Sequence, residues 1–226
     1  MKTHKIFSYV LRYDDGAAPN PYWDVCTLAI CKPGIRKKAE IGDWILGTGN
    51  KKFGNDRVVY AMKVSRKKLL KEYDEYCKIN LKNKIPKWDS KNFKLRVGDC
   101  VYDYSEGDEP KLRKSVHDER NKKRDLSGQY VLMSDHFYYF GNNQARQFQI
   151  PEELKEIIKK NQGYKKIEKL DLIESFEIWI NKFGKNKIYG EPQLKKEFES
   201  AEHMNNKCAI RDLQDDNSNN KEEIVC

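Results

Sequence analysis

Residues 39–49 read AEIGDWILGTG, and this stretch indicates its own local structure more clearly than any other part of the chain. A turn at Gly42-Asp43 leads into a short apolar strand, because glycine and aspartate favour tight turns and the residues that follow are aromatic or aliphatic. A glycine-rich cationic loop comes next over residues 47–54, and a second strand is predicted over residues 57–64. The pattern predicts a hairpin of a small β-barrel whose tip can approach an anion.

Strand patterns continue on both sides of this hairpin. In residues 57–64 the apolar side chains alternate with smaller or charged ones, which is typical of a strand with one buried face. Aromatic and β-branched residues predict three more strands, over residues 4–12, 25–31 and 129–134. A helix is expected directly after Ser65, whose side chain can cap it.

The last third of the chain has a helical pattern. Pro151 suits the first position of a helix, and an apolar stripe runs at helical spacing from Leu172 to Phe183. Residues 105–128 are highly charged and poor in apolar side chains, which predicts a mobile, solvated loop. We therefore predict an α+β fold: a small mixed β-barrel-like body with flanking helices over residues 1–150, a helical extension over 151–204 that packs on it, and a disordered tail over 205–226.

Charge is spread unevenly along the chain. The formal net charge is +9, and residues 1–150 hold 30 Lys and Arg against 19 Asp and Glu, whereas residues 151–226 hold 14 against 16. Clustered cations favour a phosphate-bearing partner, because binding releases condensed counterions. The alternative is a lysine-rich composition without a specific anionic partner.

The six cysteines form no C-x-x-C pair and show no zinc-finger spacing with histidine. These spacings argue against a disulfide framework and against a structural metal site. No apolar run reaches the roughly 18 residues of a membrane-spanning helix, and the N-terminus does not resemble a signal peptide. We expect a soluble cytoplasmic protein that needs no metal or other cofactor and has no membrane partner.

The loop after the first hairpin strand is a candidate anion site. Glycines free backbone N–H groups to face an anion, and Lys51, Lys52 and Phe53 follow them. Neither the P-loop spacing nor the dinucleotide-binding spacing is present, so nucleotide hydrolysis by a P-loop is not expected. The alternative is a flexible hairpin loop with solvated lysines.

A second group of candidate binding residues lies around residues 20–36. Asn20 and Arg36 have side chains suited to base edges, and Lys32 adds a cation. Tyr22 and Trp23, beside a proline-rich loop, could stack on a base if they are exposed. The alternatives are that Asn20 stabilises a turn and that Arg36 forms a surface ion pair.

Three residues are candidates for catalysis, and none belongs to a recognised catalytic motif. His136 titrates near neutrality and follows Asp135, but neighbouring side chains in a strand point to opposite faces, so Asp135 would not orient it. Asp43 and Cys31 are the other candidates. Cys31 lies in an apolar run, where a free cysteine commonly behaves as a small hydrophobic residue.

The chain resembles the second of the nucleotide-modification-associated domain families, found in phage and bacterial genomes near DNA-modification genes. The resemblance covers residues 5–150 or so. It rests on Tyr9, Ala18-Pro19-Asn20-Pro21, Cys26-Thr27-Leu28-Ala29, Cys31-Lys32-Pro33, Ile35-Arg36, Gly42-Asp43-Trp44, Gly47-Thr48-Gly49, Val59-Tyr60-Ala61-Met62-Lys63-Val64 and Phe137-Tyr138-Tyr139-Phe140-Gly141. A looser resemblance links Gly42-Asp43 and the strand after it to PUA-like barrels of the EVE and YTH types, many of which bind modified bases in an aromatic pocket.

These resemblances imply a binding module that recognises a modified base or nucleotide in a DNA-modification or phage-defence context, with nucleic acid or a nucleotide as its partner. Two alternatives stay open. One is an enzyme that modifies a nucleotide or base, or removes a modification, through His136, Asp43 or Cys31. The other is a protein-interaction subunit of such a system, with the helices of residues 151–204 as the surface that binds its protein partners.

Overall fold

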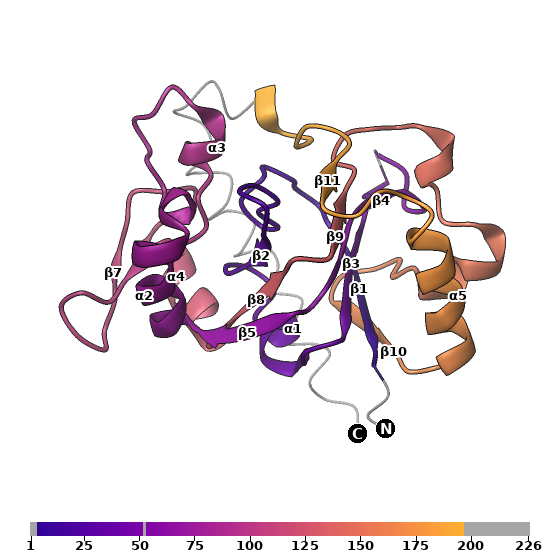
Figure 1. The fold of residues 1–226 in the computed structure, drawn as a ribbon, viewed down its shortest axis with the longest axis horizontal. Coiled ribbons are helices and arrows are strands. Elements are labelled where there is room, and N and C mark those ends of the chain that lie inside the picture. The colour runs from indigo at the N-terminus through magenta and orange to yellow at the C-terminus, as the bar shows by residue number, and fades with distance from the viewer. Residues whose placement is uncertain (1–3, 52, 197–226) are drawn as a thin grey trace.

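Two β-sheets joined through a bend form the centre of the fold (Figure 1). The computed structural model describes residues 4–51 and 53–196. The larger sheet has the strand order β10-β1-β3-β4-β9-β11 and the smaller has the order β2-β8-β5, while β6 and β7 pair separately. The strands are β1 (Ile6–Val10), β2 (Cys26–Leu28), β3 (Trp44–Thr48), β4 (Val58–Lys63), β5 (Arg66–Leu69), β6 (Tyr102–Asp103), β7 (Lys111–Leu112), β8 (Tyr130–Ser134), β9 (Phe137–Tyr139), β10 (Tyr164–Ile167) and β11 (Lys187–Ile188).

Helices cover the two sheets from opposite sides. α2, α3 and α4 lie on the side of the small sheet, and α5 lies on the side of the large sheet (Figure 1). The helices are α1 (Pro33–Lys38), α2 (Leu70–Asn80), α3 (Phe93–Arg96), α4 (Glu119–Ser127) and α5 (Leu170–Ile180), with 3₁₀ helices η1 (Lys82–Lys84), η2 (Arg146–Phe148) and η3 (Glu152–Ile157). None of the described helices is long and apolar enough to cross a membrane.

The predicted hairpin is confirmed: β3 and β4 pair antiparallel, with Trp44 opposite Lys63. The pairing shifts register between Gly47 and Thr48, where the Tyr60 ring lies directly against Gly47. A Cβ at Gly47 would approach that ring to 2.4 Å, so this close approach requires glycine. β1 runs parallel to β3 on its other side, which places the carboxyl ends of both strands at the same edge of the sheet.

The bend arises because two paired strands pass from one sheet into the other. β4 continues into β5 and β8 continues into β9, and β4 pairs with β9 while β5 pairs with β8. At the bend, the Ser134 hydroxyl donates to the carbonyl of Lys63 at 2.6 Å. A helix was predicted directly after Ser65. Strand β5 occupies that position instead, and α2 begins only at Leu70.

The curved sheets do not form the closed barrel that the sequence predicted. Over the described residues, the large sheet ends at β10 and β11, and the small sheet ends at β2 and β5. The fold is a mixed α+β arrangement in which helices cover the outer faces of open sheets. The PUA-like barrel is therefore not confirmed.

Three apolar cores hold these layers together. The inner core fills the curve between the sheets and includes Tyr9, Tyr60 and Tyr139, whose side chains are fully buried. The second core lies under α5 and includes Trp44 and Phe176, whose rings meet edge to face at 5.3 Å. The third core lies between the small sheet, α2 and α3. Both faces of β4 are consequently buried, where only one buried face was expected.

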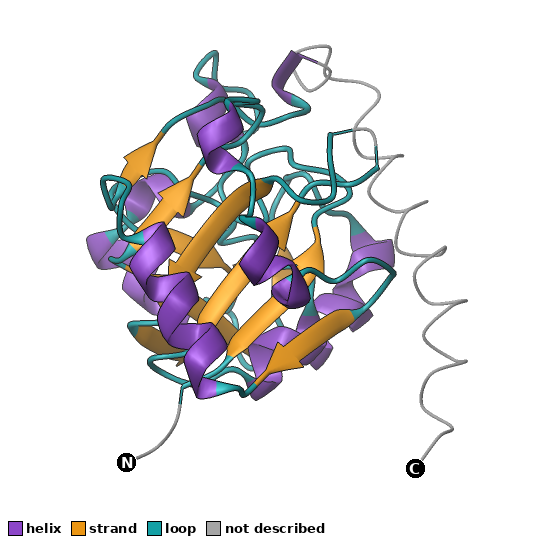
Figure 2. Ribbon diagram, turned by 90° about the vertical axis from the view of Figure 1, so that its right-hand side faces the viewer, coloured by secondary structure: helices purple, strands orange, loops and turns teal. Residues whose placement is uncertain are grey.

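Residues 151–196 form part of the sheet as well as helices. α5 confirms the helical stripe between residues 172 and 183, and it lies across the outer face of the large sheet (Figures 1 and 2). β10 pairs with β1, and β11 pairs with β9, so this segment supplies both edge strands of that sheet. The predicted disordered tail lies outside the described residues, as does the end of the predicted extension.

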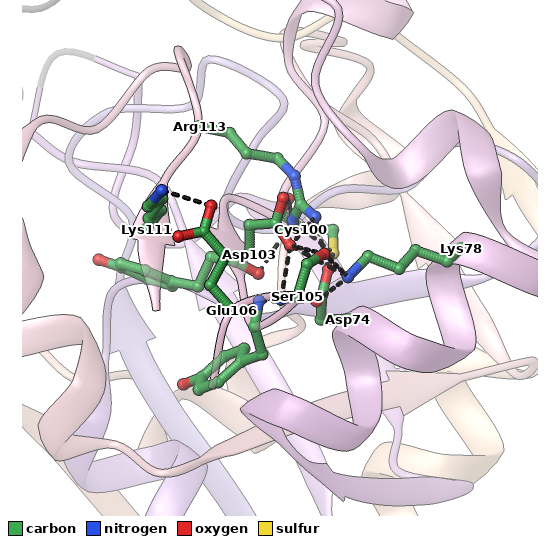
Figure 3. A network of polar contacts seen from close by, with 10 residues as sticks. Asp74, Lys78, Cys100, Asp103, Ser105, Glu106, Lys111 and Arg113 are labelled. Carbon is green, nitrogen blue, oxygen red and sulfur yellow. Dashed lines mark hydrogen bonds and ion pairs between the residues drawn. The ribbon is translucent and has the colours of Figure 1, made fainter. Parts of the chain in front are cut away.

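The charged segment expected to be a mobile loop is anchored on α2. Asp74 on α2 is fully buried and accepts from Arg113 Nη2 and Lys78 Nζ, each at 2.7 Å (Figure 3). Asp103 also accepts from Lys78, at 3.0 Å, and from the Ser105 hydroxyl, at 2.6 Å. These bonds add to the packing of Val116, Leu112 and Leu126 of this segment in an apolar core, and composition alone did not reveal its order.

We predict that a chain ending at residue 150 loses cooperative unfolding. Removing residues 151–226 takes away β10, β11 and α5, which exposes the core around Trp44. Thermal unfolding followed by near-ultraviolet circular dichroism measures this, with a chain ending at residue 204 as the matched control. A cooperative transition in the shorter chain would show that the helices are an independent docking element.

Candidate active site

Cys31 lies in a sharp turn between β2 and α1. Cys31 and Lys32 both have left-handed backbone angles, with φ of 58° and 44°. Such angles are costly for residues with a Cβ, and they persist where the surrounding structure imposes them. Cys31, three residues beyond the end of β2, is partly exposed.

His117 and Asp125 approach Cys31 from the charged segment and from α4. The Cys31 sulfur lies 3.5 Å from His117 Nε2, and the opposite ring nitrogen, Nδ1, lies 2.5 Å from Asp125 Oδ2. Both His117 and Asp125 are buried. Asp125 also accepts from the Cys31 backbone N–H at 2.8 Å and from the Tyr102 hydroxyl at 3.0 Å. The three side chains form a compact cysteine–histidine–aspartate array in which the imidazole contacts both the sulfur and the carboxylate.

Arg36 holds the two halves of this array together. Its fully buried guanidinium donates to the backbone carbonyls of Cys31, Tyr130 and Asp125, at 2.8, 2.7 and 2.5 Å. Gly128 makes room for it, since a Cβ there would lie 2.5 Å from the guanidinium carbon. Arg36 therefore fixes the turn at Cys31 against both β8 and α4.

The electrostatics of the array favour a protonated His117. Burial by itself opposes the charged imidazolium, but the Asp125 carboxylate and the Cys31 sulfur outweigh it, so the pKa of His117 lies well above its ordinary value. Burial likewise raises the pKa of Asp125, yet His117 and Arg36 bring it below the ordinary value. The pair is held as imidazolium and carboxylate.

The same three side chains could in principle ligate a metal, because their donor atoms lie within 4.8 Å of one another. In this structure the same groups contact one another, with His117 Nε2 toward Cys31 and Nδ1 toward Asp125. A bound cation and a hydrogen-bonded array are therefore alternative uses of these three residues.

A thiol, an imidazole and a carboxylate in this order form an activated nucleophile. The imidazole takes or holds the thiol proton, and the carboxylate fixes its tautomer and stabilises its charge. Of the three, only Cys31 is more than marginally exposed. The imidazole and the carboxylate are shielded from solvent, and Cys31 is the member of the array that has exposed surface.

Asn20 and Arg36, predicted as base-reading residues, are both fully buried. Asn20 donates to the Val97 carbonyl at 2.8 Å, and its side-chain oxygen accepts from the buried Lys84 at 2.7 Å. Arg36 makes neither a surface ion pair nor an exposed contact. Both side chains hold loops in place, and neither has solvent-exposed surface that a ligand could contact.

The aromatic pair Tyr22-Trp23 is less exposed than expected. Tyr22 is buried and Trp23 is half-buried. Together with Phe137 and Lys94 they line a small pocket of about 170 Å³. The Tyr22 hydroxyl and Trp23 Nε1 have no hydrogen-bond partner within the described part of the chain.

The cationic candidates lie elsewhere. Lys32 Nζ lies over the Tyr9 ring, 4.8 Å from its centre, beside the turn at Cys31. Lys51 is exposed and lines a larger pocket at the end of β3, and Phe53 is half-buried in the same loop. Lys52 lies outside the described residues.

His136 and Asp43 have structural surroundings. His136 Nε2 lies 3.1 Å from the Tyr138 hydroxyl, its ring packs edge-on against Trp44, and burial lowers its pKa. Asp43 accepts from the backbone N–H groups of Lys5 and Glu40, each at 2.9 Å. Of the three catalytic candidates, the structure places only Cys31 beside a possible base.

Sequence reasoning missed His117 and Asp125. Both lie in the charged segment predicted to be a solvated loop, 86 and 94 residues from Cys31. Asp118 and Asn121 do form a capping box at the start of α4, and this local signal could have placed a helix there. No spacing rule could have paired His117 with Cys31.

We predict opposite pH dependences for two histidines. Because the pKa of His117 is raised, its stabilisation is complete below the unfolded value of about 6.5 and is lost as pH rises through the folded value. The gap in unfolding free energy between wild type and His117→Gln should therefore shrink by about 1.4 kcal/mol per pH unit above 6.5. Urea unfolding between about pH 5 and 9 measures it.

His136→Gln is the matched control for that experiment. Its pKa is lowered, so any stabilisation it gives should rise, not fall, as pH increases toward 6.5. A pH-independent effect of His117→Gln would contradict the ion pair with Asp125.

A comparison against protein families gives one match. The family model described as nucleotide modification associated domain 2 matches residues 3–201, well beyond the 5–150 covered by the resemblance noted above. No curated protein and no solved structure matches the chain. The match covers most of the chain, including the Cys31 turn, His117 and Asp125, and the chain therefore belongs to the nucleotide modification associated domain 2 family.

Proposed function

We propose that the protein is a cysteine-dependent enzyme that transfers an acyl group to or from a nucleotide or a base in nucleic acid. The observation that carries this proposal is the contact of the partly exposed Cys31 sulfur with His117, whose other nitrogen is bonded to Asp125. The left-handed turn at Cys31 supports it, because strained backbone angles cluster at functional sites.

The proposed reaction has two halves. Cys31 reacts as the thiolate, with its proton already on His117, and the sulfur attacks the acyl carbon while the carbonyl electrons move to oxygen. When they return, the bond to the leaving oxygen or nitrogen breaks and His117 returns the proton to that atom, which leaves a thioester. An amine, hydroxyl or water then attacks the thioester, loses a proton to His117, and frees the sulfur as the thiolate, with that proton left on His117.

The nucleotide as substrate is supported by the family description and by charge. Family membership associates the chain with nucleotide modification, and residues 1–150 have a balance of 30 cationic against 19 acidic residues. Lys32, next to Cys31 and partly exposed, would attract a substrate phosphate toward the sulfur.

We predict that p-nitrophenyl acetate acetylates Cys31. Neutral hydroxylamine cleaves a thioester but leaves acetyl-lysine intact, so peptide mass spectrometry before and after hydroxylamine identifies the site. His117→Gln should slow the acetylation by about 10²-fold or more, because it removes the base. Cys26→Ala, which removes the buried cysteine of the same segment, is the matched control and should react at the wild-type rate.

Two results would overturn the enzyme proposal. One is the absence of a hydroxylamine-sensitive acetyl group on Cys31, and the other is an equal rate in His117→Gln. The nucleotide is tested separately by mass spectrometry of nucleosides from phage DNA with modified bases, incubated with wild type or Cys31→Ala. Thioester formation without any change in the nucleosides would place the acyl acceptor outside nucleic acid.

A second candidate function is recognition of a modified base without catalysis. It is favoured by the pocket of about 170 Å³ at Tyr22 and Trp23, which has room for a single ring. Trp23 and Asp24 are held in consecutive left-handed conformations, with φ of 66° and 62°, so the pocket wall is strained. The unpartnered Tyr22 hydroxyl and Trp23 indole N–H would be available for a ligand after a small rearrangement.

We predict for this alternative that Trp23→Ala weakens binding to single-stranded DNA containing 5-hydroxymethylcytosine. A lost stacking contact costs roughly 1–3 kcal/mol per base, which is about 5- to 150-fold in affinity. Fluorescence anisotropy measures it, with the unmodified strand for comparison and Trp88→Ala, outside this pocket, as the control. Equal affinity of wild type for both strands would rule out recognition of this modification.

A further inference from the structure

A second, larger cavity lies where the two parallel strands of the large sheet end. It measures about 600 Å³, and residues 10, 12, 13, 50, 51, 55 and 160–162 line it. These segments follow β1, follow β3 and precede β10, so three chain segments distant in sequence meet there. We call it the basic pocket.

The charge of the basic pocket is one-sided. Arg12, Lys51 and Lys160 line it, and no aspartate or glutamate is among its lining residues. The remaining polar wall consists mainly of side-chain amides, including Asn161 and Asn55, which can donate hydrogen bonds. Three cations around one cavity favour a phosphate, whose negative charge they would neutralise.

Hydrogen bonds hold the wall in shape. Asn50 Nδ2 donates to the Arg12 carbonyl at 2.9 Å, which ties the loop after β3 to the end of β1. Arg12 Nη2 donates to Gln162 Oε1 at 3.3 Å, which ties β1 to the segment before β10. Asn50 Oδ1 also accepts from the Phe53 backbone N–H at 3.2 Å. The cations are thus carried by segments fixed to one another.

We propose that the basic pocket binds a phosphate group of a nucleotide or of a nucleic-acid strand. It goes beyond the proposed chemistry at Cys31 and does not depend on it. The two places share strand β1: Lys32, beside Cys31, lies over Tyr9, and the next residue, Val10, lines the pocket.

The test uses the full chain and two probes. One is fluorescein-labelled single-stranded DNA of about 12 nucleotides, and the other is a fluorescent deoxynucleoside monophosphate. Anisotropy titrations between about 50 and 200 mM salt give the affinity and its salt dependence. Lys51→Gln combined with Lys160→Gln removes two exposed cations of the pocket. Lys82→Gln combined with Lys91→Gln removes two exposed cations elsewhere and is the matched control.

We expect wild type and the control to bind alike, and the pocket variant to bind about tenfold more weakly at the lower salt. For a single strand, the slope of log affinity against log salt should shrink by about 1.4, or 0.7 for each lost phosphate contact. Binding of the DNA alone identifies a nucleic-acid backbone as the ligand, and binding of both probes identifies a nucleotide site.

Two outcomes would overturn the basic pocket as a phosphate site: neither probe binds the wild type, or the pocket and control variants weaken equally. Cys31→Ala should bind both probes with wild-type affinity. Its behaviour separates failure of this proposal from failure of the proposed chemistry, because acetylation of Cys31 is measured without any nucleic acid.

Discussion

The buried guanidinium of Arg36 is the contact on which the rest of the candidate site depends. It bonds to three backbone carbonyls, from the Cys31 turn, from α4 and from β8, which no apolar side chain of the same volume could join. Burial lowers the pKa of Arg36, and the nearby Asp125 opposes that shift. The charge is thus compensated within the same cluster that it organises, as buried charges in proteins usually are. Beside it, the bond from the Cys31 backbone N–H to Asp125 is a second link between the segments that carry the sulfur and the imidazole.

A second buried cation organises the opposite end of β2. Lys84 is fully buried and donates to Asn20, to the Val25 carbonyl and to Thr27, and Thr27 in turn donates to the buried Asp99 at 2.5 Å. Burial lowers the pKa of Lys84 and raises that of Asp99, while the attraction between the two opposes both shifts. β2 has only three residues. The buried side chains of Arg36 and Lys84, near its two ends, therefore hold it in place. This explains why left-handed residues are tolerated on either side of it.

The local sequence pattern predicted the elements that turn residues or apolar periodicity determine. These are the β3–β4 hairpin, β1 and the stripe of α5. It did not predict that β10 and β11 would join the large sheet, because two to four residues carry too little periodicity to identify a strand. The charged segment was misjudged for a different reason: its order comes from Arg113 and Lys78 on the buried Asp74, and such pairing is invisible in composition. The sequence identified Cys31 as a candidate catalytic residue. Its partners His117 and Asp125 lie in the charged segment, so the sequence did not show that the three residues meet.

Burial distinguishes the polar residues that hold the site together from those that can contact a ligand. Asn20 and Arg36 are residue types that can read base edges. The residue type does not determine where the side chain points, and in this structure both side chains point inward and donate to backbone carbonyls. The array at Cys31 is closed on that side by Arg36 and by the buried His117 and Asp125. The side of Lys32, which packs on Tyr9 of β1, is not closed by these residues. β1 leads on to Arg12 and the parallel strand β3 leads on to Lys51, so the same pair of strands positions two cations of the basic pocket.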